Sequence, residues 1–166
     1  MEMSKLKSWG IFILCSGVLI ALDLWLKHWA AANLQNQPPR GLVPGLIGLT
    51  YLENPGAAFG LFAGFAWGRV VLSVVSILLM VGILWYYSRI PTEKRFWFIR
   101  APLILIFAGG VGNLIDRLAL GVVRDMLQFL FINFPIFNLA DVYVTVGAFS
   151  FMFVTLFIVK DAPFFA

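Results

Sequence analysis

The chain has little of the chemistry from which metal centres and covalent catalysts are usually built. Its 166 residues include one cysteine and one histidine, which excludes a disulfide framework, a zinc site and a haem held by two histidines. We expect Cys15 to be a small buried hydrophobic residue and His28 to lie near an interface. HExxH, P-loop and dinucleotide-binding motifs are also missing, as is any Ser–His or Cys–His arrangement. The sequence therefore predicts neither a metal nor another cofactor.

Charged residues are scarce as well. They make up 12% of the chain, and 61% of the residues are hydrophobic, whereas soluble domains average about 25% charged and about 45–50% apolar residues. An unusually apolar soluble protein is the alternative, but it would expose much apolar surface to water. The net charge is +4, yet no basic stripe with interleaved aromatic residues follows a polar face, which argues against nucleic-acid binding. The composition predicts a single membrane domain, residues 1–166.

Four segments are long and apolar enough to cross a bilayer as helices, which takes about 20 residues each. They cover about 9–32, 67–87, 101–123 and 139–159, and polar residues interrupt the third. The first could be mistaken for a cleaved signal peptide, but its apolar run is too long. Strands of a β-barrel would show ten-residue alternating segments instead. We therefore expect an all-α membrane protein with four transmembrane helices.

Basic residues set the expected orientation. Seven of the 12 lie before the first span, between the second and third, or after the fourth: Lys5, Lys7, Arg89, Lys94, Arg95, Arg100 and Lys160. The positive-inside rule then places both termini and the 88–100 loop in the cytoplasm, and the 33–66 and 124–138 loops outside. The first outer loop carries prolines, glycines and a β-like patch at 46–52, which predicts a small surface sheet and a possible lid. In the second we expect a short interfacial helix or a dipping loop.

Two aspartates flank the second outer loop. Asp125 and Asp141 are sixteen residues apart, with Pro135 between them, and an acid at a membrane boundary is a functional-site hypothesis by default. Two carboxylates brought close together cannot both ionise easily, so one keeps its proton. The ionised one can then take a proton from water that attacks a carbonyl group. The alternative is two independent acids at the water interface, and the spacing leaves both interpretations open.

Asparagines stand three residues before two of the acids. Asn138 precedes Asp141 and could orient its carboxylate, or it could be a helix N-cap with Asp141 in the first turn; the two roles are compatible. Asn113 and Asp116 repeat the spacing. Asp116 is therefore a rival catalytic acid, unless it forms an ion pair or a structural network with Arg117.

Other features allow both structural and functional interpretations. Asp23 stands four residues before Lys27, which suits an ion pair along a helix or contact with a polar substrate group. Residues 54–60 form a turn-rich segment, and the glycines within 109–112 allow helices to pack closely. A small transporter or proton relay would also carry intramembrane acids, but it predicts acids spread through the bilayer and a repeat. A non-catalytic membrane scaffold is the third class.

Five blocks appear in a fixed order: Asp23 with Lys27, NPGAAFG at 54–60, GGVGNLIDR at 109–117, Val123–Asp125, and FNLAD at 137–141. Together they resemble the bacterial lipoprotein signal peptidases (signal peptidase II), and the match covers nearly the whole chain. The resemblance implies an aspartic endopeptidase without cofactor. Such an enzyme removes the signal peptide from diacylglyceryl-modified prolipoproteins on the N-terminal side of the lipidated cysteine. It also implies a bacterial inner-membrane location, an active site near the outer face, a β-cradle from the first outer loop and a short interfacial helix.

The resemblance assigns roles to individual residues. It implies that Asp125 and Asp141 are catalytic and that Asp116 is structural. Substrate-binding or dyad-supporting roles fall to Asp23, Asn54, Gly56, Asn113, Arg117 and Asn138. Arg124 departs from the pattern, because many members have a small or apolar residue there, and Met126 replaces a frequent phenylalanine. An adjacent arginine would favour the ionised form of Asp125. One chain contains every group required, so we expect a monomer whose partners are membrane lipids and the prolipoprotein.

Overall fold

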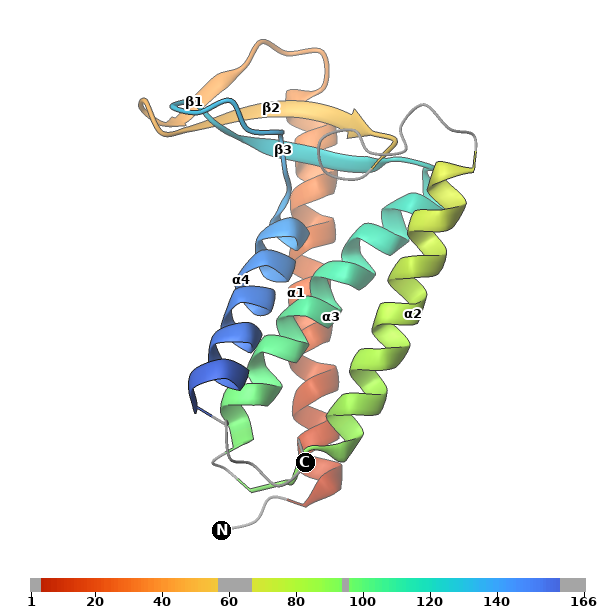
Figure 1. Ribbon diagram of the computed structural model, residues 1–166. Helices are drawn as coiled ribbons and strands as arrows, with labels where there is room; N and C mark the ends of the chain where they lie inside the picture. The colour runs from red at the N-terminus through yellow and green to blue at the C-terminus, as the bar shows by residue number, and fades with distance from the viewer. Residues whose placement is uncertain (1–3, 57–66, 94–95, 159–166) are drawn as a thin grey trace.

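Four long helices and a three-stranded sheet make up the computed structural model, which describes residues 4–56, 67–93 and 96–158 (Figure 1). The helices are α1 (Lys5–Leu34), α2 (Gly68–Arg89), α3 (Trp97–Ala119) and α4 (Leu139–Phe153), and a π-helical turn, η3 (Val154–Ile158), continues α4. Each of the four is long and apolar enough to cross a membrane. The expected all-α membrane fold is confirmed, and the protein is a multi-pass membrane protein.

The third helix begins and ends earlier than the expected 101–123 span. It stops at Ala119, and Gly121 then adopts a left-handed conformation with φ of 82°, which a residue without a Cβ tolerates best. This turn redirects the chain into a strand that begins at Val123. Residues 120–123 therefore belong to the sheet end of the bundle and not to the span.

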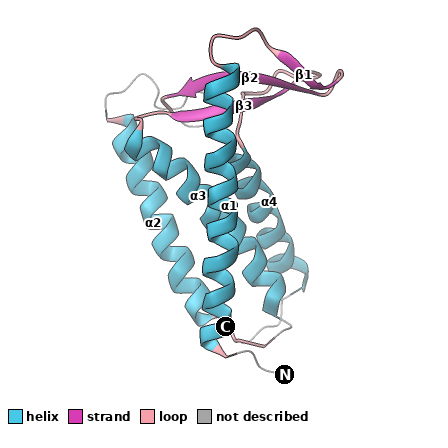
Figure 2. Cartoon of the chain, turned by 180° about the vertical axis from the view of Figure 1, so that it is seen from behind, coloured by secondary structure: helices cyan, strands magenta, loops and turns pink. Residues whose placement is uncertain are grey.

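The sheet lies across one end of the helix bundle, which we call the sheet end (Figures 1 and 2). Its strands β1 (Arg40–Val43), β2 (Ile47–Asn54) and β3 (Val123–Phe129) are antiparallel in the order β1-β2-β3. The first outer loop thus supplies two strands. The third comes from the second outer loop, where a helix or dipping loop was expected, so that prediction was wrong.

The error has a physical reason. The free edge of β2 offers unpaired backbone groups, and β3 satisfies them while burying Val123 and Met126. Within the described parts of the two outer loops, residues 35–56 and 120–138, no helix forms. The expected interfacial helix is not found in these ranges, and residues 57–66 lie outside the described residues.

After β3 the chain folds back along the strand that it has just left. The carbonyl oxygen of Phe137 accepts hydrogen bonds from the backbone N–H groups of Met126 and Leu127, at 3.0 and 2.8 Å. Helix α4 begins immediately afterwards, so its first turn is held beside β3. This return closes the sixteen-residue gap between Asp125 and Asp141.

Two apolar clusters hold the two ends of the bundle. The larger lies at the end away from the sheet, around Phe12, Tyr87 and Ile99, and the smaller joins Ala30 and Leu34 of α1 to Met126 beneath the sheet. Between them α3 and α4 approach closely at Gly109, where an added Cβ would collide with the backbone oxygen of Ala140 and with Val144. The site described next depends on that approach.

Candidate active site

Asp125 lies in the middle of β3 with its side chain buried. Its two carboxylate oxygens accept hydrogen bonds from two amides: Asn54 Nδ2 to Oδ2 at 3.1 Å and Asn138 Nδ2 to Oδ1 at 2.7 Å. Asn54 is itself oriented, because its Oδ1 accepts from the backbone N–H of Gly56 at 3.0 Å. Asn54 therefore turns its donor toward Asp125. Residues 57–60 of the same block, and the rest of the expected lid up to 66, fall outside the described residues.

Asp141 lies in the first turn of α4. Asn138 caps this helix: its Oδ1 accepts from the Asp141 N–H, and Asp141 Oδ2 accepts from the Asn138 N–H, both at 3.0 Å. The expected N-cap is confirmed. The other oxygen of Asp141 accepts from Asn113 Nδ2 of α3 at 2.8 Å. A reciprocal capping box and an amide from a neighbouring helix thus fix this carboxylate.

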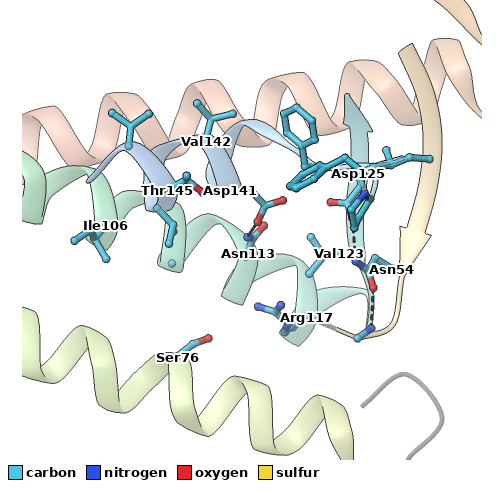
Figure 3. Close-up of a pocket in the computed structure, with 18 of the residues that line it drawn as sticks. Asn54, Ser76, Ile106, Asn113, Arg117, Val123, Asp125, Asp141, Val142 and Thr145 are labelled. Atoms are coloured by element: carbon cyan, nitrogen blue, oxygen red, sulfur yellow. Dashed lines mark hydrogen bonds between the residues drawn. The ribbon is translucent and has the colours of Figure 1, made fainter. Parts of the chain in front are cut away.

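One side chain connects the two acids. Asn138 Nδ2 donates to Asp125 Oδ1 and also to Asn113 Oδ1 at 3.0 Å, and Asn113 in turn donates to Asp141. Figure 3 shows the carboxylates of Asp125 and Asp141 and the amides of Asn54 and Asn113 around one cavity. The structure therefore brings both acids together, although they come from a strand and a helix.

The cavity has a volume of about 570 Å³ and opens among α2, α3, α4 and the sheet. Arg117 lines it beside the two acids, and Ser76 projects from α2 on the other side (Figure 3). Most of the remaining wall is apolar, with Thr145 as a further hydroxyl. Sequence reasoning missed Ser76 and Thr145; the only available signal was that both are polar residues inside apolar spans.

Burial makes Asp125 a weaker acid than an exposed aspartate. Its removal from water, and next the nearby charge of Asp141, raise the pKa of Asp125 to about 7, and the hydrogen bonds from Asn54 and Asn138 oppose the shift only in part. The expectation that Arg124 would favour the ionised form was wrong, because the guanidinium of Arg124 turns away to another acid.

That other acid is Asp116. Arg124 donates to both of its oxygens, with Nη2 at 2.7 Å from Oδ1 and Nε at 3.1 Å from Oδ2. Lys27 lies 3.8 Å from the same carboxylate. Among the described residues, the ion pairs of Asp116 are thus with Arg124 and Lys27, while Arg117 lines the cavity instead. These contacts support the structural role that the family resemblance implies for Asp116.

Asp23 lies outside the cavity but fixes the start of α4. Its Oδ1 accepts from the backbone N–H of Ala140 at 2.9 Å, and its Oδ2 lies 2.8 Å from Lys27 Nζ, the ion pair that the spacing suggested. Gly112 makes room for it, because an added Cβ would come within 2.5 Å of Asp23 Oδ2. Asp23 therefore joins α1, α3 and α4 behind the two catalytic candidates.

Lys27 also orients the amide of Asn113. An ammonium group only donates hydrogen bonds, so Asn113 Oδ1, 2.9 Å from Lys27 Nζ, must face it. The Nδ2 of Asn113 is then left to donate to Asp141. A fully buried cation thus determines how the amide between the two acids is oriented.

The arrangement suits acid–base chemistry on a carbonyl group. Two neighbouring carboxylates, one of which is protonated near neutral pH, can divide the work of activating water and polarising a carbonyl. A metal would need a different arrangement; among the residues described, no three His, Cys, Asp or Glu side chains are placed so that they could hold a metal ion together. The apolar cavity wall would receive an apolar segment beside the acids.

A family model and named relatives both place this chain in the same family. The family model described as signal peptidase (SPase) II matches residues 15–157. A protein of Streptococcus thermophilus named lipoprotein signal peptidase is 45% identical over 129 residues, which are 78% of this chain and 81% of that protein. One of Streptococcus pyogenes with the same name is 40% identical over 137 residues, covering 82% and 87% of the two chains.

The fold also matches solved structures. A bacterial membrane enzyme determined by the in meso method superimposes with a TM-score of 0.77 at 23% identity, covering 93% of this chain and 92% of that one. A second such structure gives a TM-score of 0.76 at 24% identity. The sequence resemblance is thereby confirmed. The chain belongs to the signal peptidase II family, whose members are aspartic peptidases.

Proposed function

We propose that this protein removes the signal peptide from prolipoproteins whose cysteine carries diacylglycerol, cutting on the N-terminal side of that cysteine. The relatives named lipoprotein signal peptidase support the substrate class. The site supports the reaction type, since it presents two carboxylates, and no histidine stands beside Ser76 among the described residues that line the cavity. We assign the catalytic pair to Asp125 and Asp141.

The single observation that carries the proposal is the amide bridge between the two acids. Asn138 and Asn113 hold the carboxylates of Asp125 and Asp141 toward one cavity through bonds of 2.7–3.0 Å. Independent acids at a water interface would need no such bridge. Asn54, Arg117 and Gly56 line the same cavity, which suits the substrate-binding or supporting roles expected of them.

In the proposed reaction Asp141 begins as the ionised member and Asp125 as the protonated one, as the raised pKa of Asp125 favours. Asp141 takes a proton from water while the water oxygen attacks the scissile carbonyl carbon, and Asp125 gives its proton to the carbonyl oxygen. The C–N bond then breaks. The leaving nitrogen receives the proton held by Asp141, and the hydroxyl proton of the intermediate returns to Asp125, so the pair is restored.

The proposed membrane arrangement follows from the basic residues. The end of the bundle away from the sheet carries Lys5, Lys7 and Arg89, which the positive-inside rule assigns to the cytoplasm. The sheet and the cavity then face outward at the cytoplasmic (inner) membrane of a bacterium. All the groups invoked come from one chain, so a monomer in contact with lipid suffices.

The test is cleavage of a diacylglyceryl prolipoprotein peptide in detergent. We expect Asp125→Asn and Asp141→Asn each to lower turnover by about 10³-fold or more, because each removes a proton-transfer group, while folded protein is still obtained. Glu53→Gln, the same acid-to-amide change at an exposed position on β2, is the matched control and should retain turnover. Near-normal cleavage by either dyad variant would refute the assignment.

A proton-relay or transport function makes a different prediction. The buried acids Asp23, Asp116 and Asp125 gather with Asp141 near the sheet end, whereas a relay needs groups through the whole bilayer depth. Proton flux in liposomes that is lost in Asp125→Asn, without any peptide cleavage by the unaltered protein, would favour the relay.

A further inference from the structure

Arg124 is the residue immediately before Asp125, and it makes the most extensive side-chain contact between β3 and the helices. Successive side chains of a strand point to opposite faces, so Arg124 turns away from the cavity that Asp125 lines. Its side chain is buried, 8% exposed, against an Asp116 side chain that is 1% exposed. Besides the two guanidinium bonds already described, the backbone N–H of Arg124 donates to Asp116 Oδ2 at 3.1 Å. Three hydrogen bonds thus tie residue 124 to the last turn of α3.

This attachment also balances the buried charge behind the site. Asp23, Lys27, Asp116 and Arg124 are two acids and two bases, all buried. Lys27 Nζ already lies within 2.9 Å of Asp23 and Asn113 but 3.8 Å from Asp116. Without Arg124, the carboxylate of Asp116 would compete with Asn113 for the ammonium group of Lys27. Because Arg124 pairs with Asp116, Lys27 remains free to donate to Asn113 Oδ1.

We propose that Arg124 is a positioning residue for Asp125, acting through Asp116. The proposal rests on the function proposed above. Fixing the backbone at residue 124 fixes the depth and direction of the next carboxylate, which the amides of Asn54 and Asn138 then hold through its two oxygens. Misplacing a catalytic group by about 1 Å can lower a rate by about 100-fold.

Two other roles for Arg124 predict different kinetics. If it served folding alone, its loss would lower the melting temperature and leave the turnover of folded enzyme unchanged. If its charge acted directly on Asp125, its loss would shift the pH profile and leave the maximal rate unchanged. Its paired donors face Asp116, which argues against a direct charge effect on Asp125, and the kinetics of folded variants separate the positioning role from a role in stability alone.

The test compares Arg124→Met with Arg40→Met, the same change at an exposed arginine of the same sheet. We expect Arg124→Met to lower kcat about 10- to 100-fold with KM changed less than about 2-fold. Arg124→Lys, which keeps the charge but not the paired donors, should recover part of the loss. Arg40→Met should match the unaltered enzyme in both constants.

Several outcomes overturn the proposal. Wild-type kcat in folded Arg124→Met reduces Arg124 to a stabilising residue, and an unchanged maximal rate with a shifted pH profile makes it a direct electrostatic effector. If Arg124→Met yields no folded protein, Arg124→Lys decides, because wild-type kcat in that variant would refute the need for paired donors. An active Asp125→Asn would instead refute the function proposed above, whereas an inactive Asp125→Asn beside a fully active Arg124→Met refutes the positioning role only.

Discussion

Both ends of the helix bundle bury an arginine, but they surround it with different partners. At the end away from the sheet, Arg100 is 2% exposed and donates to the Ser8 hydroxyl and to the backbone oxygens of Ile90 and Pro91, at 2.7 and 3.0 Å for the oxygens. Its guanidinium also lies over the ring of Tyr87, 5.1 Å from the centroid. None of these partners is a carboxylate.

At the sheet end, every buried cation faces a carboxylate. Arg124 pairs with Asp116 and Lys27 with Asp23, at 2.7 and 2.8 Å. The comparison shows two uses of a buried cation. Neutral oxygen acceptors hold a loop against helix ends, whereas paired charges lie behind the amides that contact the two proposed catalytic acids. We therefore expect changes at the sheet end to alter turnover, and changes at the other end to alter stability alone.

The largest expected loss of stability follows from removing Lys27. In Lys27→Met the carboxylate of Asp23 stays buried without its counter-charge, which costs about 3–5 kcal/mol of unfolding free energy. Asn113 Oδ1 also loses its charged donor and keeps that of Asn138, so its amide is held less firmly and we expect kcat to fall at least about 10-fold. Unfolding in mixed micelles and peptide cleavage measure the two effects.

A double variant separates these two effects. Lys27→Met with Asp23→Asn removes both charges, so we expect it to recover part of the lost stability. Turnover should stay low, since Asn113 still lacks the charged donor that helps to turn its amide toward Asp141. Wild-type kcat in the double variant would show that Lys27 contributes to stability alone, as we expect for Arg100.

The next effect concerns pH. Asp125 has a pKa of about 7 in the folded protein and about 3.9 when unfolded. Between these values the folded state binds more protons, so this group makes stability fall as pH rises, by up to about 4 kcal/mol. The contribution is fully present below pH 4 and lost above pH 7.

The measurement compares Asp125→Asn with the unaltered protein at several pH values. Asparagine cannot ionise, so the variant lacks this penalty, and we expect its melting temperature to rise relative to wild type between pH 5 and pH 8. In wild type we also expect cleavage to decline above about pH 7, as Asp125 loses the proton that it must donate. A melting-temperature difference that does not change with pH would contradict the raised pKa.

The sequence was sufficient for the parts of the fold that depend on composition. In lipid, an apolar run of about 20 residues satisfies its backbone N–H and C=O groups by forming a helix. Helices α2 and α4 accordingly begin within a residue or two of the expected positions. The capping box of Asn138 and Asp141 was also readable, because it depends on a local three-residue spacing. The ion pair of Asp23 with Lys27 is local in the same way.

Contacts between segments that are distant in the chain could not be predicted from the sequence. Strand β3 forms because β2 offers an edge, which no periodicity within 123–129 reveals. The partner of Asp116 was expected at Arg117 and is Arg124, because the turn at Gly121 brings the strand back over the last turn of α3. Likewise, the second donation of Asn138, to Asp125, depends on the return of the chain at Phe137.

A smaller effect is expected at Arg100. In Arg100→Met the buried carbonyl oxygens of Ile90 and Pro91 lose a charged donor, so we expect a loss of about 2–3 kcal/mol. Folded enzyme should keep kcat and KM within about 2-fold. Arg89→Met, at an exposed arginine over the ring of Trp85, is the matched control and should cost less than about 1 kcal/mol. A fall in kcat for Arg100→Met would show that the two ends are coupled.

The smallest expected loss of stability comes from removing the hydroxyl of Tyr87, whose ring lies beneath Arg100. Tyr87 Oη lies 3.0 Å from Ser8 Oγ and donates to Ser8 O at 3.0 Å, whereas the ring packs 4.6 Å from that of Phe12. Tyr87→Phe keeps the ring contacts and removes both hydrogen bonds, so we expect a loss of about 1 kcal/mol with no change in turnover. Tyr51→Phe, whose exposed hydroxyl donates to Glu53, should cost less. Equal losses in the two variants would mean that burial adds nothing to these bonds, and that Arg100 is held by its carbonyl contacts alone.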